Sequence, residues 1–284
     1  MGVLAFRILV GIAVAYLATL ALLFVFQSRF IYPAPQERHD PAPGFEAVEL
    51  LTPDGLDLTV HWRPPETGKP VVVWFHGNAS SLAGSTAETS VLAENGYGVL
   101  LASYRGYGGN AGEPSEQGFY EDGRVAMKFL AEQGIAPAQT IVGGTSIGSG
   151  TATQMAMEFR PGALILISPF TSLTDVASNA LPIFPVRLLL RDKYDNSAKL
   201  SELEAPVLIQ HGTADNVVPF EQGKALSEKA NDAVFESFEG AGHDLSFVRE
   251  AQKAQALWLE SRGFGLDPMI APITSSEPDP LLEN

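Results

Sequence analysis

Val142-Gly-Gly-Thr-Ser-Ile-Gly-Ser-Gly150 decides the fold, because it joins a short apolar run to a segment that reads as a helix. It contains Gly144-Thr-Ser-Ile-Gly148, which matches the G-x-S-x-G pattern of a sharp strand-to-helix turn. The flanking glycines let the chain turn more tightly than larger side chains allow. The pattern therefore predicts that the Ser146 hydroxyl projects from the top of a sheet.

Two other uses of a glycine-rich turn fit this stretch less well. A phosphate loop of the form G-x-x-x-x-G-K-[ST] needs a lysine at the helix start, and none occurs between Lys128 and Lys193. A dinucleotide fingerprint needs the first strand of its βαβ unit before it and an acidic residue about 20 residues later, and this segment has neither. On this pattern alone, a glycine-rich joint with an incidental serine stays open.

Short apolar runs surround this turn. The runs are 71–75, 99–102, 140–142, 163–167, 207–210 and 234–238. Most are continuous, which is typical of strands in a parallel sheet covered on both faces. The stretches 117–133 and 147–160 predict intervening helices. The pieces 47–51 and 56–62 predict an antiparallel hairpin at one edge. The fold class is therefore α/β, with functional residues in loops at the carboxyl ends of the strands.

Such loops supply partners for Ser146. A serine needs a base to accept its proton, and that base needs an acid to orient it. Asp215 and His243 each follow a predicted strand, and the order Ser146, Asp215, His243 is that of α/β-hydrolases rather than chymotrypsin or subtilisin. Three other aspartates are rival acids: Asp192, Asp195 and Asp244. The first two belong to an insertion and the third adjoins the histidine, which favours Asp215 as the acid.

The loop His76-Gly-Asn-Ala79 follows the most hydrophobic predicted strand. We expect the backbone N–H groups of Asn78 and Ile147 to form an oxyanion hole, because this fold draws one from a loop and one from the residue after the nucleophile. His76 is expected to orient the loop and not to act as the base. Asn78-Ala-Ser80 is also a glycosylation sequon, and we expect it to be unoccupied because a glycan would block the site.

The amino terminus carries an uncharged, almost wholly apolar run from Ile8 to Phe26, about 19 residues, which is roughly what a helix needs to cross a bilayer. A cleaved signal peptide is the competing interpretation, but its apolar region is usually about 7 to 15 residues long. A buried core helix is a further alternative. Arg7 on one side of the run, against Arg29 and Arg38 on the other, leaves orientation weakly determined, with a preference for an extracytoplasmic catalytic domain.

These signals divide the chain into four parts. The expected scheme is an anchor over 1–29, a Pro-rich spacer over 30–44, a catalytic domain over 45–265 and a disordered tail over 266–284. Within the domain, an insertion at about 170–204 is apolar enough to form a lid.

Composition excludes several function classes. The chain has 284 residues, a formal net charge of −15 and no cysteine. A nucleic acid would have to bind against this charge, so it is not an expected partner. Thiol catalysis and cysteine-ligated metal sites are absent as well.

Several motifs together resemble the α/β-hydrolase family of serine hydrolases. They are His76-Gly-Asn, Tyr104-Arg-Gly-Tyr-Gly-Gly109, Gly112-Glu-Pro-Ser-Glu116, Gly144-Thr-Ser-Ile-Gly148, Ser168-Pro-Phe-Thr-Ser172, His211-Gly-Thr-Ala-Asp215 and Gly242-His-Asp244. In motif order, residues 25–262 resemble the membrane-anchored bud-emergence-type (ABHD-like) branch, which is related to animal depalmitoylases and lysophospholipases. Ser103 and Asn110 depart from the residues common there, which weakens inference about the substrate.

The substrate pocket is expected near Tyr104, Arg105, Phe170, Leu181 and Phe184. Leu181-Pro-Ile-Phe-Pro-Val-Arg-Leu-Leu-Leu190 is strongly apolar for a connection, so a lid that binds acyl chains and a lid that only packs onto the domain are both open. Arg105 either contacts an anionic headgroup or braces its own loop, and the second interpretation is favoured.

The sequence thus predicts a membrane-anchored serine hydrolase that cleaves carboxylic esters or thioesters of acyl or lipid-like substrates through an acyl-enzyme, without metal or organic cofactor. Its expected partners are a small-molecule or acylated substrate and the lipid bilayer. An acyltransferase or amidase using the same triad, and a non-catalytic membrane-tethered interaction protein, are the alternatives. Oligomeric state, acyl-chain preference and physiological role stay open.

Overall fold

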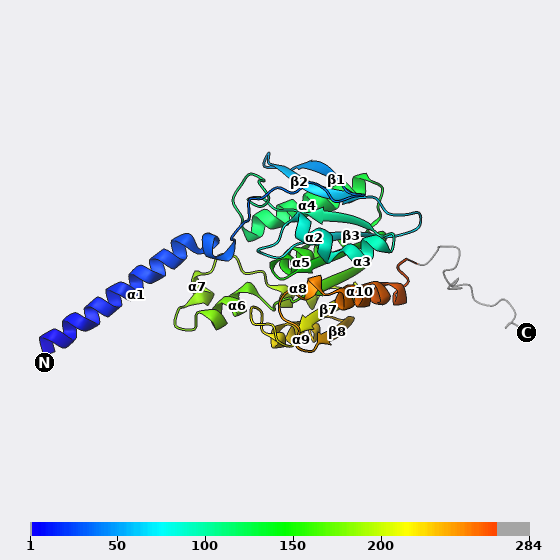
Figure 1. The fold of residues 1–284 in the computed structure, drawn as a ribbon. Helices are drawn as coiled ribbons and strands as arrows, with labels where there is room; N and C mark the ends of the chain where they lie inside the picture. The colour runs from blue at the N-terminus through cyan, green and yellow to red at the C-terminus, as the bar shows by residue number, and fades with distance from the viewer. Residues whose placement is uncertain (1, 266–284) are drawn as a thin grey trace, which may run out of the picture.

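The computed structural model describes residues 2–265 (Figure 1). The predicted tail at 266–284 lies outside the described residues. Helix α1 (Gly2–Ile31) extends from one side of an α/β body (Figure 1). The segment after α1 then runs along the body to the first strand (Figure 1). Among the described residues, α1 is the one helix long and apolar enough to cross a membrane. Its side chains are mostly exposed, so it is not a core helix of this domain.

The centre of the body is one eight-stranded sheet with the order β1-β2-β4-β3-β5-β6-β7-β8. Its strands are β1 (Glu46–Leu51), β2 (Asp57–Arg63), β3 (Val71–Phe75), β4 (Gly98–Ala102), β5 (Thr140–Thr145), β6 (Ala163–Ile167), β7 (Val207–Gly212) and β8 (Ala233–Phe238). Strand β2 pairs antiparallel with both β1 and β4, and the pairs formed among β3 to β8 are parallel. The predicted edge hairpin and parallel sheet are therefore confirmed.

Helices cover both faces of the sheet, which explains the continuous apolar runs. In β3, Val71, Val73 and Phe75 join one core cluster. Val72 and Trp74 join the other. The first face is covered by α4 (Glu116–Glu132), α5 (Ile147–Phe159), α8 (Asn196–Leu200) and α9 (Phe220–Ser227). The second face is covered by α2 (Leu82–Glu88), α3 (Ser90–Glu94) and α10 (Arg249–Ser261). Short 3₁₀ turns occur at Pro137–Gln139 and Leu245–Phe247.

Three short helices lie in the insertion between β6 and β7, and two of them, α6 (Leu173–Ala180) and α7 (Val186–Leu189), lie beside the end of α1 (Figure 1). Polar contacts fix this arrangement: the Tyr16 hydroxyl donates to the carbonyl of Ile183, and the side chain of Gln27 donates to that of Leu189. The structure thus places the predicted lid segment against the predicted anchor.

The start of the body differs from the predicted spacer. Helix α1 continues through Ile31, and Tyr32 is buried in the core with its hydroxyl bonded to Asp192 and Tyr194. The proline residues mark an extended segment only after this point. The aromatic side chain explains the difference, because burying a tyrosine whose hydroxyl is paired stabilises the junction.

Candidate active site

Ser146 lies at the junction of β5 and α5, where the chain turns sharply. Its φ of 53° and ψ of −119° are an unusual conformation for a non-glycine residue, and its N–H donates to the carbonyl of Ile167 at 2.9 Å. The glycines of the motif provide space for this turn. A Cβ on Gly148 would lie 2.1 Å from the carbonyl oxygen of Phe75, and one on Gly144 would lie 2.4 Å from that of Gly148. Only glycine fits at both positions.

The loops after β7 and β8 bring Asp215 and His243 to this serine. His243 Nε2 lies 2.9 Å from Ser146 Oγ, and His243 Nδ1 lies 2.8 Å from Asp215 Oδ2. The structure therefore brings together the three residues chosen from sequence, in a continuous chain of hydrogen-bonding distances. The imidazole is positioned to accept a proton from the hydroxyl while the carboxylate faces its other nitrogen.

The Asp215 carboxylate is buried, and every near neighbour of it favours its charged form. The backbone N–H groups of Val217 and Val218 both donate to Oδ1 at 2.9 Å. His211 Nε2 lies 3.2 Å from Oδ2. Burial opposes ionisation, but the hydrogen bonds from His211 and His243 outweigh it and hold the pKa of Asp215 well below its usual range. Asp215 thus stays ionised wherever the protein is folded near neutral pH.

The loop after β3 lies opposite Ser146. Gly77, Asn78 and Ile147 line the same cavity as Ser146 and His243, which is where the predicted oxyanion donors belong. The Asn78 side chain fixes the loop, because its Oδ1 accepts from the Tyr107 hydroxyl at 2.6 Å and its Nδ2 donates to the carbonyl of Ile31 at the end of α1. The oxyanion loop is therefore fastened to the helix that precedes the domain.

His76 is the histidine of this loop, and the structure makes it a poor base. It is fully buried, and its Nδ1 lies 2.8 Å from the carbonyl of Gly77. Burial lowers the pKa of His76 to about 4, so the ring is neutral at pH 7. It packs edge-on against Tyr104, whose hydroxyl donates to the His76 carbonyl at 3.1 Å. These contacts fit a residue that shapes the loop.

Comparisons with known proteins identify the family of this chain. The family model described as serine aminopeptidase, S33 (Hydrolase_4) matches residues 66–194. An uncharacterized protein of Mycobacterium tuberculosis is 37% identical over 216 residues, which cover 72% of this chain and 76% of that protein. The lysophosphatidylserine lipase ABHD12 of Danio rerio is 32% identical over 203 residues, which cover 64% of this chain and 52% of that lipase.

A solved structure gives the same fold. The Pyrococcus furiosus esterase Pf2001 superposes with a TM-score of 0.66 at 18% identity, covering 80% of this chain and 98% of the esterase. The chain belongs to the α/β-hydrolase family. Its ABHD-like branch, expected from the motifs, fits these relatives. The family and fold predictions from sequence are therefore confirmed.

This α/β-hydrolase has a cavity of about 690 Å³ over Ser146. Phe170 lines it, as expected from sequence. Leu181 and Phe184 instead line a neighbouring apolar cavity between the lid and α1. Within residues 2–265, no group of three or more histidine or carboxylate side chains is arranged to hold a metal ion.

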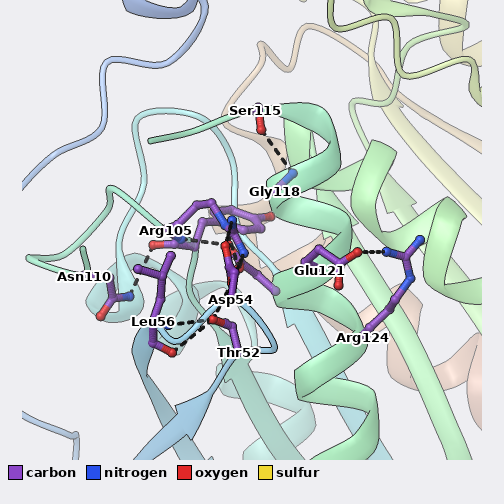
Figure 2. A network of polar contacts seen from close by, with 11 residues as sticks. Thr52, Asp54, Leu56, Arg105, Asn110, Ser115, Gly118, Glu121 and Arg124 are labelled. Carbon is purple, nitrogen blue, oxygen red and sulfur yellow. Dashed lines mark hydrogen bonds and ion pairs between the residues drawn. The ribbon is translucent and has the colours of Figure 1, made fainter. Parts of the chain in front are cut away.

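Tyr104 and Arg105, which were expected in the pocket, do not line this cavity. The Tyr104 ring is fully buried and stacks on Phe119 with centroids 4.0 Å apart. Arg105 Nη1 donates to Asp54 at 2.8 Å (Figure 2). Its Nε donates to Asp122 at 2.9 Å. Both acids lie on neighbouring elements, so the arginine braces its loop, as the favoured interpretation held.

Sequence reasoning missed Glu88, a buried carboxylic acid on the cavity wall. Its Oε2 accepts from Trp74 Nε1 at 2.6 Å and from the hydroxyl of Thr145, the residue before Ser146, at 3.2 Å. One local signal existed, since Glu88 is the only charged residue between His76 and Glu94. Also missed were Phe30 and Ile31, which reach the cavity from the end of α1.

Proposed function

We propose that this protein is a membrane-anchored serine hydrolase that cleaves carboxylic esters or thioesters. One observation carries the proposal: the Ser146 hydroxyl, the His243 imidazole and the Asp215 carboxylate are in line at 2.9 and 2.8 Å, with the serine open to a cavity of about 690 Å³. A serine is activated by this arrangement and not by its own pKa.

The reaction proceeds through an acyl-enzyme. Ser146 Oγ attacks the acyl carbon while His243 Nε2 accepts its proton, and the ionised Asp215 stabilises the imidazolium. The N–H groups of Asn78 and Ile147 donate to the oxyanion, each contributing about 3 to 4 kcal/mol. The imidazolium returns its proton to the leaving alcohol or thiol. Water, deprotonated by His243, then attacks the acyl-enzyme and releases the acid.

An apolar acyl group suits the surroundings of Ser146. Phe30, Ile31, Leu173 and Val176 line the cavity, and among the described residues no lysine or arginine does. The relatives support this chemistry, since one is named an esterase and another a lysophosphatidylserine lipase. We therefore assign lipid-like esters as the first substrates to test.

The proposed layout keeps the scheme expected from sequence with one change. Helix α1 is the membrane anchor, and the domain begins at Tyr32, which is already part of the core. The catalytic domain therefore covers 32–265 in place of 45–265, and its lid stays at about 170–204. Arg7 near the helix start favours an extracytoplasmic domain, because basic residues are retained on the cytoplasmic side.

The test is covalent labelling of the detergent-solubilised protein with a fluorophosphonate, with the modified peptide located by mass spectrometry. Wild type should be labelled at Ser146, and Ser146→Ala and His243→Ala should lose the label. Ser246→Ala is the matched control, because Ser246 lines the same cavity but its buried hydroxyl has no partner among the described residues. Folded wild type that takes no label, or that is labelled at Ser246, would rule out the triad.

A further inference from the structure

A second cavity adjoins the one over Ser146. We call it the anchor–lid groove, and it runs between Leu20, Leu23 and Phe24 of α1 and Leu181, Phe184 and Leu189 of the lid. Its lining is almost wholly apolar. Phe30, Ile31 and Ala177 line both this groove and the cavity that contains Ser146. The two spaces therefore meet at these three side chains.

Specific contacts hold the two walls of the groove together. Gln27 is the one buried residue of α1, and its Oε1 accepts from the N–H of Arg191 at 2.9 Å while its Nε2 reaches the carbonyl of Leu189 at 3.3 Å. Tyr16 stacks on Phe184 with ring centroids 5.6 Å apart. The buried Gln27 side-chain amide, paired in this way, favours one position of the lid on α1. In any other position the Gln27 amide and its two backbone partners would be left without hydrogen bonds.

The groove lies at a depth where lipid chains are found. Tyr16, which bonds to the lid, precedes the end of α1 at Ile31 by 15 residues, or about 22 Å of helix. The polar zone on each side of a bilayer is only about 5 to 8 Å thick. If α1 spans the membrane, the lid tip reaches the hydrocarbon. Ile183 and Leu188 are 73% and 84% exposed, which suits lipid contact.

We propose that the anchor–lid groove binds the acyl chain of a membrane lipid ester and delivers its carbonyl carbon to Ser146. This site rests on the proposed function and adds its substrate class and route of entry. The acyl chain of the lipid moves sideways from the bilayer into the space between α1 and the lid. The ester end of the lipid then passes Ile31 and Ala177 and enters the cavity that contains Ser146. No part of the acyl chain crosses water on this path, which removes the cost of exposing it.

The experiment fills the groove and compares chain lengths. Leu23→Trp and Leu189→Trp place an indole in the groove from either wall. The matched controls are their neighbours Leu22→Trp and Leu188→Trp, whose side chains are 58% and 84% exposed and do not line it. The protein in phosphatidylcholine vesicles is assayed with p-nitrophenyl butyrate and p-nitrophenyl palmitate. Losing contact with two methylene groups should lower kcat/KM for palmitate by about tenfold.

The expected pattern is a loss of about tenfold with palmitate in both groove variants, with butyrate hydrolysis within about twofold of wild type and both controls unchanged. Equal kcat/KM values for groove and control variants would overturn the groove and leave the proposed function standing. A water-soluble palmitoyl-peptide thioester is assayed in parallel. If the groove variants lose activity only toward this thioester, the acyl group does not come from a membrane lipid, and that part of the proposal is overturned.

A binding readout separates this proposal from the failure of catalysis. If Ser146 takes no label and neither ester is cleaved, the proposed function fails, and the groove is then tested by photolabelling with a diazirine-bearing palmitate. Crosslinks within residues 181–190 that Leu189→Trp removes would support the groove. Crosslinks spread evenly over the exposed surface of α1 would overturn it.

Discussion

At the scale of single residues, two histidines contact Asp215, and their surroundings separate their roles. His211 is fully buried, and its Nε2 lies 3.0 Å from the carbonyl of Val218 as well as 3.2 Å from Asp215. It can hold the carboxylate in place but cannot reach a substrate. His243 is partly exposed and faces both Asp215 and Ser146. Exposure toward the cavity therefore decides which histidine can serve as the base.

Glu88 gives a prediction about stability and pH. Burial raises the pKa of Glu88, although hydrogen bonds from Trp74, Thr145 and Ser80 oppose the shift. The folded protein then holds a proton that the unfolded chain has lost, so stability falls as the pH rises from about 4.5 through the raised pKa. Glu88→Gln keeps an oxygen for Trp74 and Thr145 and cannot ionise. It should be more stable than wild type at neutral pH.

The measurement is urea unfolding of both proteins between pH 5 and pH 8. The advantage of Glu88→Gln should grow as the pH increases. Glu260→Gln is the control, because it removes the same charge from an exposed position on α10 and should not change the slope. A wild-type protein whose stability relative to Glu88→Gln is constant over this range would contradict the raised pKa.

At the scale of elements, the sequence predicts best those strands and turns that depend only on residues close together in the chain. The sequence predicts the strands 71–75 and 163–167 with the bounds that the structure shows, because each is a continuous apolar run buried on both faces. The turn at Ser146 was recognised from its glycines for a similar reason. Tyr104 and Arg105 do not line the pocket expected from sequence, because their motif fixes a loop but not the direction of its side chains, although Arg105 does brace that loop.

Gln27 ties two elements together, and its replacement should loosen the lid. Gln27→Leu leaves the N–H of Arg191 and the carbonyl of Leu189 without their partner. An unpaired buried group costs about 1 to 3 kcal/mol, so the amide of Arg191 should exchange its hydrogen at least about fivefold faster. Thr19→Val is the control, since the Thr19 hydroxyl bonds only to the carbonyl of Ala15 within α1. Unchanged exchange at Arg191 would show that the apolar contacts alone position the lid.

At the scale of the whole molecule, the missing part of the prediction is the contact between segments far apart in the chain. Asn78 bonds to Ile31, Gln27 to Leu189 and Tyr32 to Asp192. Composition and periodicity assign each segment separately, as anchor, loop or lid, and carry no information on which segments meet. The site therefore looked self-contained in sequence, whereas α1 forms part of its wall.

Removing most of α1 tests its proposed role as a membrane anchor. A protein lacking residues 2–26 keeps Gln27, Tyr32 and the whole sheet, so the triad should still form and Ser146 should still react with the fluorophosphonate. The shortened protein should leave the membrane fraction, because it lacks the helix proposed to hold it in the bilayer. Its remaining residues carry excess negative charge, so anionic lipids do not attract it. Vesicle flotation measures this directly. If the shortened protein still floats with the vesicles, the exposed lid side chains Ile183 and Leu188 must bind lipid without the anchor.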